Sequence, residues 1–250
     1  MRLLVVNPNI SESVSQLIGD EARRAASSGT EITMLTAPFG VAYIETRFEA
    51  LIGAYAAAEV VAEHWPGHDA VIIAAFGDPG VPGIREALDI PVVGLTEAAL
   101  MSACLLGKRF SIVAISRRIT AWYRECVELN GLIDRLASIR SLDQPLRDIG
   151  RVQDDHARRL KELCGAAVNE DGADVIVLAG APLAGLARAM KGELTVPVID
   201  GVSSAVRHAE TFVSLQPGIA RAGSFAAPPA KPNAGLSRPM QDLLRRSAGG

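Results

Sequence analysis

Short runs of apolar residues alternate along the chain with longer segments in which apolar and polar residues recur at helical spacing. Runs of four to eight apolar residues that end at glycine, proline or asparagine predict buried strands. Such runs occupy residues 2–6, 31–37, 70–76, 90–95, 110–116, a weaker one around Ile139, 174–180 and 196–202. Strands that alternate with helices predict βαβ units and a parallel sheet.

The segments between these runs predict helices, because their apolar residues recur every three or four positions. Ser11 is a suitable N-cap for the first helix and Gly107 is a suitable end for the fourth. The expected helices cover 11–26, 48–63, 83–88, 96–107, 119–131 and 152–172. From about Ala226 the chain is rich in proline and extended, and 240–250 predicts a short helix that frays.

The pattern repeats once. Asp69 matches Asp174, and Pro91 matches Pro197, each pair being about 105 residues apart. The fold class expected is therefore α/β, with two four-stranded parallel-sheet domains related by a pseudo-twofold axis. We assign 1–100 with about 205–250 to the first domain and 101–204 to the second. Ligands of open parallel sheets bind beyond the carboxyl ends of the strands, so two facing units would enclose one cleft containing the active site.

Composition narrows the classes of function. The chain has 250 residues, of which 21% are charged, with a net charge of -3 and no basic patch, which argues against nucleic acid and for a small-molecule partner. No apolar run approaches the roughly 20 residues of a membrane span. The three cysteines are far apart and form no C-x-x-C pair, so we expect a cytoplasmic protein without a structural zinc site. No Walker, G-x-G-x-x-G or H-E-x-x-H motif indicates a nucleotide or metal. A homo-oligomer is also expected.

Several polar residues fall at the predicted strand ends. Asp78 lies in the turn "GDPG", Glu97 opens the helix after the fourth strand, and Asp200 interrupts an apolar strand. Each also has a structural explanation, as turn former or as partner of a helix N-terminus. The other candidates are Tyr43 and Glu45 after the second strand, Asn7 after the first, Ser116 after the fifth, and the backbone N–H groups of Phe76-Gly77 and Gly180-Ala181, which would form an oxyanion-binding nest.

Four motifs together resemble the aspartate/glutamate/hydantoin racemase superfamily, and within it the hydantoin and allantoin racemases. They are "NPN", "AFGDPG", "GLTEAA" and "GAPLAGLA". The resemblance covers nearly the whole chain and implies a cofactor-free racemase with its site between two domains. It also implies substrate contacts for Asn7 and Glu45 and a place near the cleft for Glu97.

The resemblance further implies two catalytic cysteines, one at each strand tip, which remove and return the proton α to a carbonyl. In this chain the first aligns with Ala75, and the second with Gly180 or, if the loop shifts, Ala181. Neither residue type carries a proton. Cys104, Cys126 and Cys164 are all predicted to lie within helices, as small buried side chains.

Three functions remain open. The first is a hydantoin-racemase-like isomerase in which Asp78, Asp200 and Glu97 transfer the protons and the remaining candidates, with Ala75, bind substrate. The second is decarboxylation, lysis or hydrolysis on the same scaffold, which needs only one acid or base. The third is a non-catalytic binding protein, against which three carboxylates around one pocket would count.

Overall fold

A computed structural model describes residues 1–143 and 148–247 and contains two parallel sheets of four strands each. The first sheet has the order β2-β1-β3-β4, with β1 at Arg2–Asn7, β2 at Glu31–Thr36, β3 at Ala70–Ile73 and β4 at Val92–Gly94. The second has the order β6-β5-β7-β8, with β5 at Phe110–Ala114, β6 at Leu136–Ser141, β7 at Val175–Ala179 and β8 at Val198–Asp200. The two orders are equivalent, which confirms the internal repeat and the predicted fold class.

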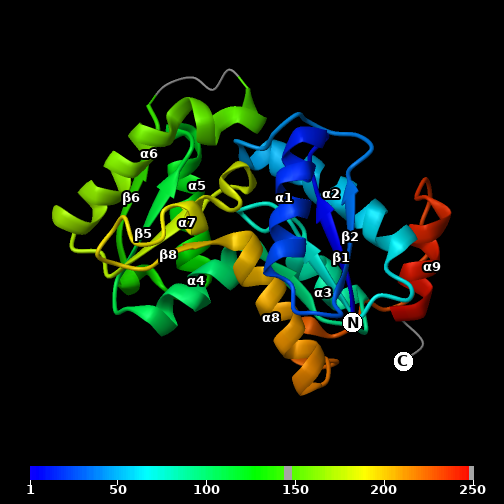
Figure 1. Ribbon diagram of the computed structural model, residues 1–250. Coiled ribbons are helices and arrows are strands. Elements are labelled where there is room, and N and C mark those ends of the chain that lie inside the picture. Colours follow the sequence, from blue (N-terminus) through cyan, green and yellow to red (C-terminus); the bar gives the residue numbers. More distant parts are fainter. Residues whose placement is uncertain (144–147, 248–250) are drawn as a thin grey trace.

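Helices cover both sheets, and the two domains lie side by side (Figure 1). Their bounds are α1 Glu12–Ala25, α2 Arg47–His64, α3 Val81–Ala87, α4 Leu95–Leu106, α5 Thr120–Leu129, α6 Val152–Asn169, α7 Leu186–Ala189, α8 Gly201–Leu215 and α9 Arg238–Ser247. Ser11 caps α1 by accepting the N–H of Val14 at 3.4 Å, as predicted.

The strands β1, β3 and β4 of the first sheet are buried on both faces, which explains why they are almost wholly apolar. Leu3 and Val5 of β1 pack on one face with α1 and α8. Leu4 and Val6 pack on the other face with α2, α3 and Leu243 of α9. Alternate residues of one strand therefore belong to two different layers of the core.

The two domains exchange helices. Ala99, Leu100 and Ala103 of α4, the helix that follows the first sheet, pack into the core of the second domain. Val202 and Val206 of α8, which follows the second sheet, pack into the core of the first domain, where α8 contacts β3 and β4. The two exchanged helices also contact each other. The predicted boundaries near 100 and 205 thus fall inside α4 and α8.

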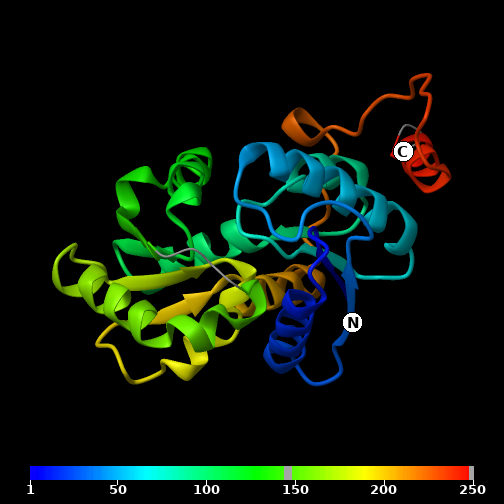
Figure 2. The same cartoon turned by 90° about the horizontal axis from the view of Figure 1, so that it is seen from above.

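The C-terminal segment returns to the first domain (Figure 2). Helix α9 packs against α2. Leu243 is buried, and the guanidinium of Arg246 lies 5.1 Å from the centre of the Trp65 ring. The short helix expected here is present at Arg238–Ser247, and residues 248–250, at the end where fraying was expected, lie outside the described residues. Within the described residues, no helix is both long and apolar enough to cross a membrane.

Candidate active site

The tip that follows β3 has an unusual backbone. Gly77 and Gly80 adopt positive φ angles of 107° and 81°, which glycine tolerates. Asp78, between them, adopts a φ of 49°, in the left-handed region that side chains with a Cβ disfavour. Strain of this kind costs about 1–3 kcal/mol and is concentrated at functional sites. The tip is therefore held in one conformation by its surroundings.

Asp78 is held by the start of α4. Its carboxylate accepts the backbone N–H of Thr96 at 2.8 Å and that of Glu97 at 2.9 Å. The carboxylate lies over Gly94, where an added Cβ would be 2.3 Å from Cγ of Asp78. Burial, assisted by the negative charge of Glu97, raises the pKa of Asp78 to about 7. This carboxyl group can hold or release a proton near neutral pH.

The tip that follows β7 is built from small residues. Gly180 has a φ of 116°, and the short 3-10 turn Ala181–Leu183 comes directly after it. Gln153 of α6 fixes this loop by donating to the carbonyl oxygens of Pro182 at 2.9 Å and Ala184 at 2.8 Å. An atom added to Gly180 would meet nothing closer than 3.6 Å, so there is room beside this tip.

A carboxylate and a hydroxyl join the two domains near the strand ends. Ser116, which follows β5, donates a hydrogen bond through Oγ to Oε1 of Glu45, in the loop after β2. Tyr43 hydrogen-bonds to the same pair, and burial together with Glu45 raises the pKa of its hydroxyl. The structure thus brings together Tyr43, Glu45 and Ser116, three residues predicted from separate segments.

Two aromatic residues of α5 complete this region. Tyr123 packs against Phe76 with the two rings tilted and their centres 4.7 Å apart. Trp122 covers Gly77, where an added Cβ would lie 2.3 Å from the indole ring. Burial raises the pKa of Tyr123, and the charges of Asp78 and Glu45 add to that shift. Tyr123 was not among the sequence candidates. The adjacent aromatic residues 122–123, in a chain with only 4% aromatics, were the available signal.

Two of the expected substrate donors already have partners in the protein. The side-chain amide of Asn7 donates to Oδ1 of Asn9 and to Oγ of Ser15, both at 3.0 Å. The backbone N–H of Gly77 donates to Oγ1 of Thr96 at 2.6 Å. The predicted nest at Phe76-Gly77 therefore lacks one of its free donors. To bind a substrate, the Asn7 amide or the Gly77 N–H would first have to give up its hydrogen bond within the protein.

Glu97 and Asp200 lie at two separate pockets on the outer edges of the sheets. Oε1 of Glu97 accepts the N–H of Gly94 at 3.0 Å and pairs with Arg85, beside the free edge of β4. Oδ1 of Asp200 accepts the N–H of Ser203 at 2.9 Å, beside the free edge of β8. Both carboxylates cap helices. The three carboxylates considered for proton transfer therefore do not surround one pocket.

All three cysteines lie in helices as expected, but only two of them are buried. Cys126 and Cys164 are buried and Cys104 is half-buried. Burial raises the pKa of both Cys126 and Cys164 to about 12, so these thiols stay protonated and unreactive at neutral pH. Among residues 1–143 and 148–247, no three histidine, cysteine or acidic side chains are grouped as metal ligands.

Comparison with known proteins decides the family. A family model described as Asp/Glu/Hydantoin racemase matches residues 3–209. The chain belongs to this family. Within it, the chain is 39% identical to a protein of Paenarthrobacter aurescens named hydantoin racemase, over 92% of this chain and 99% of that one. It is 35% identical to a hydantoin racemase of Pseudomonas sp. strain NS671, over 86% of this chain and 87% of the other.

A solved structure agrees with this placement in the family. The fold is similar to that of an allantoin racemase from Klebsiella pneumoniae, with a TM-score of 0.91, 35% identity and coverage of 96% of this chain and 98% of that one. The two-domain α/β architecture and the resemblance to the hydantoin racemase branch are both confirmed.

Proposed function

We propose that this chain is a cofactor-independent racemase that inverts a carbon α to a carbonyl in a hydantoin-like ring. The observation that carries the proposal is the near full-length similarity to hydantoin and allantoin racemases, at 35–39% identity. The Glu45–Ser116 bridge between the domains supports it, because it brings the carboxyl ends of the two sheets together. Inversion needs groups on opposite faces of a planar intermediate, which two facing domains can supply.

Ala75 and Gly180 cannot transfer protons, so this proposal requires other groups. We assign one transfer to Asp78, because a pKa of about 7 matches the working pH of a general acid or base. We assign the other to Glu45, which is hydrogen-bonded to the hydroxyl of Ser116. Glu97 and Asp200 cap α4 and α8, and we now propose that they position the strand tips instead of carrying protons.

The proposed reaction has two proton transfers. One carboxylate removes the proton from the α carbon, and the electron pair of the C–H bond delocalises into the carbonyl as an enolate. The second group, protonated beforehand, returns a proton to the opposite face of that carbon and becomes a carboxylate. Burial and nearby negative charges, those of Asp78 and Glu45 among them, raise the pKa of Tyr123, so its phenol remains protonated and would serve as a hydroxyl donor.

A single-base reaction, such as decarboxylation, is the second candidate. One observation favours it: neither tip has a titratable side chain at Ala75 or Gly180-Ala181. Protonation of an enolate formed by loss of carbon dioxide needs one acid, which Asp78 alone would provide. Hydrogen exchange without inversion at the α carbon would support a single competent group.

Solvent deuterium exchange tests the proposal. Single enantiomers of 5-substituted hydantoins and of allantoin are incubated in D2O with the protein and a chelator, and uncatalysed exchange is subtracted. We expect exchange at the α carbon, followed by NMR, with a matching loss of optical rotation. Asp78→Asn and Glu45→Gln should each lower the rate by about 10²-fold or more.

The matched control is Asp20→Asn, on the exposed face of α1, which should leave the rate unchanged. No exchange by the wild-type protein with any of these compounds would contradict the racemase proposal. Unchanged rates in both carboxylate variants would leave the reaction in place but reject its assignment to Asp78 and Glu45.

Cellular location and assembly are further proposals. We infer a cytoplasmic protein, supported by three cysteines that form no disulfide. We also propose a homo-oligomer, supported by the exposed apolar side chains of Phe48 and Leu51 on α2. Light scattering of the purified protein measures the assembly directly, and a monomer across the micromolar range would exclude it.

A further inference from the structure

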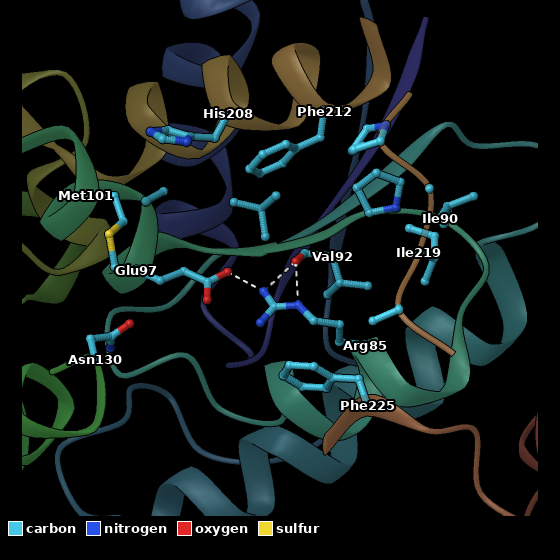
Figure 3. Close-up of a pocket in the computed structure, with 16 residues that line it drawn as sticks. Arg85, Ile90, Val92, Glu97, Met101, Asn130, His208, Phe212, Ile219 and Phe225 are labelled. Carbon is cyan, nitrogen blue, oxygen red and sulfur yellow. Dashed lines mark hydrogen bonds and ion pairs between the residues drawn. The ribbon is translucent and has the colours of Figure 1, made fainter. Parts of the chain in front are cut away.

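A pocket of about 400 Å³ lies beside β4 of the first domain, and Figure 3 shows the residues that line it. It is bounded by the free edge of β4, by α4 and α8, and by the segment 217–225 that follows α8. Its volume falls within the roughly 300–1,000 Å³ typical of small-molecule sites. Most of its surface is apolar, with Ile90, Met101, Phe212 and Ile219 among the lining residues.

An ion pair lies at the centre of this pocket. Arg85 pairs with Glu97, and its guanidinium also donates to the carbonyl oxygen of Val92 at 2.7 Å. The ring of Phe225 supports the guanidinium from one side, at 5.5 Å from the ring centre. About a quarter of each side chain stays exposed, 27% for Arg85 and 25% for Glu97. The pair is therefore fixed in position and accessible to a ligand.

An aromatic ring faces the ion pair from the opposite wall. Figure 3 shows Phe212 of α8 on one side of Arg85 and Glu97, and Phe225 on the other. Phe212 contacts the ring of His208 at 6.1 Å between ring centres, and it remains 38% exposed, which leaves apolar surface open to a ligand. A flat ring placed against Phe212 would direct its edge toward a carboxylate and a guanidinium. Burial of that ring would add to the affinity through stacking.

The arrangement of these groups defines the ligand class. Glu97 accepts hydrogen bonds and Arg85 donates them, so together they complement a ring edge with an adjacent N–H and C=O. The ion pair has no net charge, which favours a neutral ligand. We propose that this pocket binds a planar cyclic amide, a ring with neighbouring N–H and C=O groups and an apolar substituent.

The corresponding pocket of the second domain differs in its charge and, among the residues that the structure describes, in its lack of aromatic side chains. It lies along the free edge of β8, where the described lining residues include Arg24, Arg188 and Lys191 but no aromatic side chain. It offers no stacking surface for a flat ring. The roof of the first pocket, in contrast, comes from residues beyond 209, where the match to the family model ends. The proposed site is thus built partly outside the matched scaffold, and it does not depend on the racemase proposal.

The test uses 5-benzyluracil, which is planar, carries an apolar arm and has no stereocentre to invert. Isothermal titration calorimetry of the full chain should show one site per monomer. Phe212→Ala removes the stacking wall, and Glu97→Gln removes the charged acceptor while glutamine still serves the helix cap. Each change should weaken binding by roughly tenfold. The 1,3-dimethyl derivative, which lacks both N–H donors, should bind at least as weakly.

Two controls separate this pocket from the strand tips. Leu215→Ala changes an exposed residue of the same helix, 69% exposed and outside the pocket lining, and should leave affinity unchanged. Glu45→Gln alters the strand-tip region and should also leave it unchanged. Absence of binding at millimolar probe would overturn the proposal. So would binding that is lost in Glu45→Gln but kept in Phe212→Ala. Thermal melts show whether each variant is folded. If Glu97→Gln is unfolded, the binding measured with Phe212→Ala decides the test.

Discussion

Single residues at the strand tips show how the site departs from what the family resemblance implied. Ala75 and Gly180 stand where the resemblance implies thiols. Asp78, three positions beyond Ala75, has a strained backbone, is partly buried and has a raised pKa. These three properties depend on neighbours from distant segments, such as the N–H of Thr96. The sequence therefore indicated Asp78 as a candidate by type and position, while its acidity follows only from the folded surroundings.

Asp78 should make stability depend on pH. Its pKa is about 7 in the folded protein against an ordinary value of 3.8, so the folded state holds the extra proton between these limits. The free energy of unfolding should therefore fall as pH rises from about 4 to 7, by up to roughly 1.4 kcal/mol per pH unit. Asp78→Asn should remove this part of the slope. Urea denaturation at several pH values measures it.

Asp20→Asn, which changes an exposed carboxylate, should keep the wild-type slope. Parallel pH profiles for the wild-type protein and Asp78→Asn would show that the Asp78 carboxyl titrates normally, and would also remove the main support for its proposed role in proton transfer.

At the scale of elements, the turn after β3 and the start of α4 form one unit. Asp78 caps α4, Thr96 accepts from Gly77, and Gly94 leaves space for the carboxylate. Glycine at 94 is required by this close approach, since its backbone angles are ordinary for any residue. These contacts fix the turn after β3 against the start of α4, the helix that packs into the second domain.

Gly94→Ala should therefore destabilise the protein by roughly 1–3 kcal/mol, because the new methyl group displaces the Asp78 carboxylate. Gly83→Ala is the matched control. It lies in α3, is exposed, and has no atom within 4 Å of an added Cβ. That change should be neutral or stabilising by up to about 1 kcal/mol. Chemical denaturation of both variants measures the difference, and equal stabilities would contradict the close approach.

The sequence predicted the elements well, but their periodicity did not show which core each of the helices α4 and α8 joins. Each expected strand and helix is present, because apolar runs and helical periodicity are local signals. Packing of α4 on the second sheet and of α8 on the first is not local, since both helices carry apolar residues that suit either core. For the same reason Tyr123 was missed: its neighbours Phe76 and Asp78 lie far away in the chain.

For the whole molecule, the exchanged helices join the two domains into one folding unit. Each core contains residues from a helix that follows the other sheet. Arg47 and Glu125 add a contact between the domains at 2.8 Å, on the exposed surface. Neither domain can lose its structure without uncovering apolar residues of the other. Unfolding is expected to be a single cooperative transition in spite of two sheets.

The two tryptophans test this cooperativity. Trp65 ends α2 in the first domain and Trp122 lies in α5 of the second. Trp122→Phe and Trp65→Phe each leave one fluorescent reporter. Within each variant, fluorescence and circular dichroism should give the same midpoint in urea. A tryptophan midpoint that differs from the circular dichroism midpoint would show that one domain unfolds before the other.

The helix exchange also has a consequence for synthesis on the ribosome. The face of the first sheet formed by Leu3, Val5 and Ile72 is partly covered by α1 and fully covered only when α8 has been made. The opposite face is completed by α9 near the end of the chain. Most of the polypeptide must therefore leave the exit tunnel before its earliest strands are shielded from water. A nascent chain paused before residue 200 would display an apolar surface that chaperones recognise.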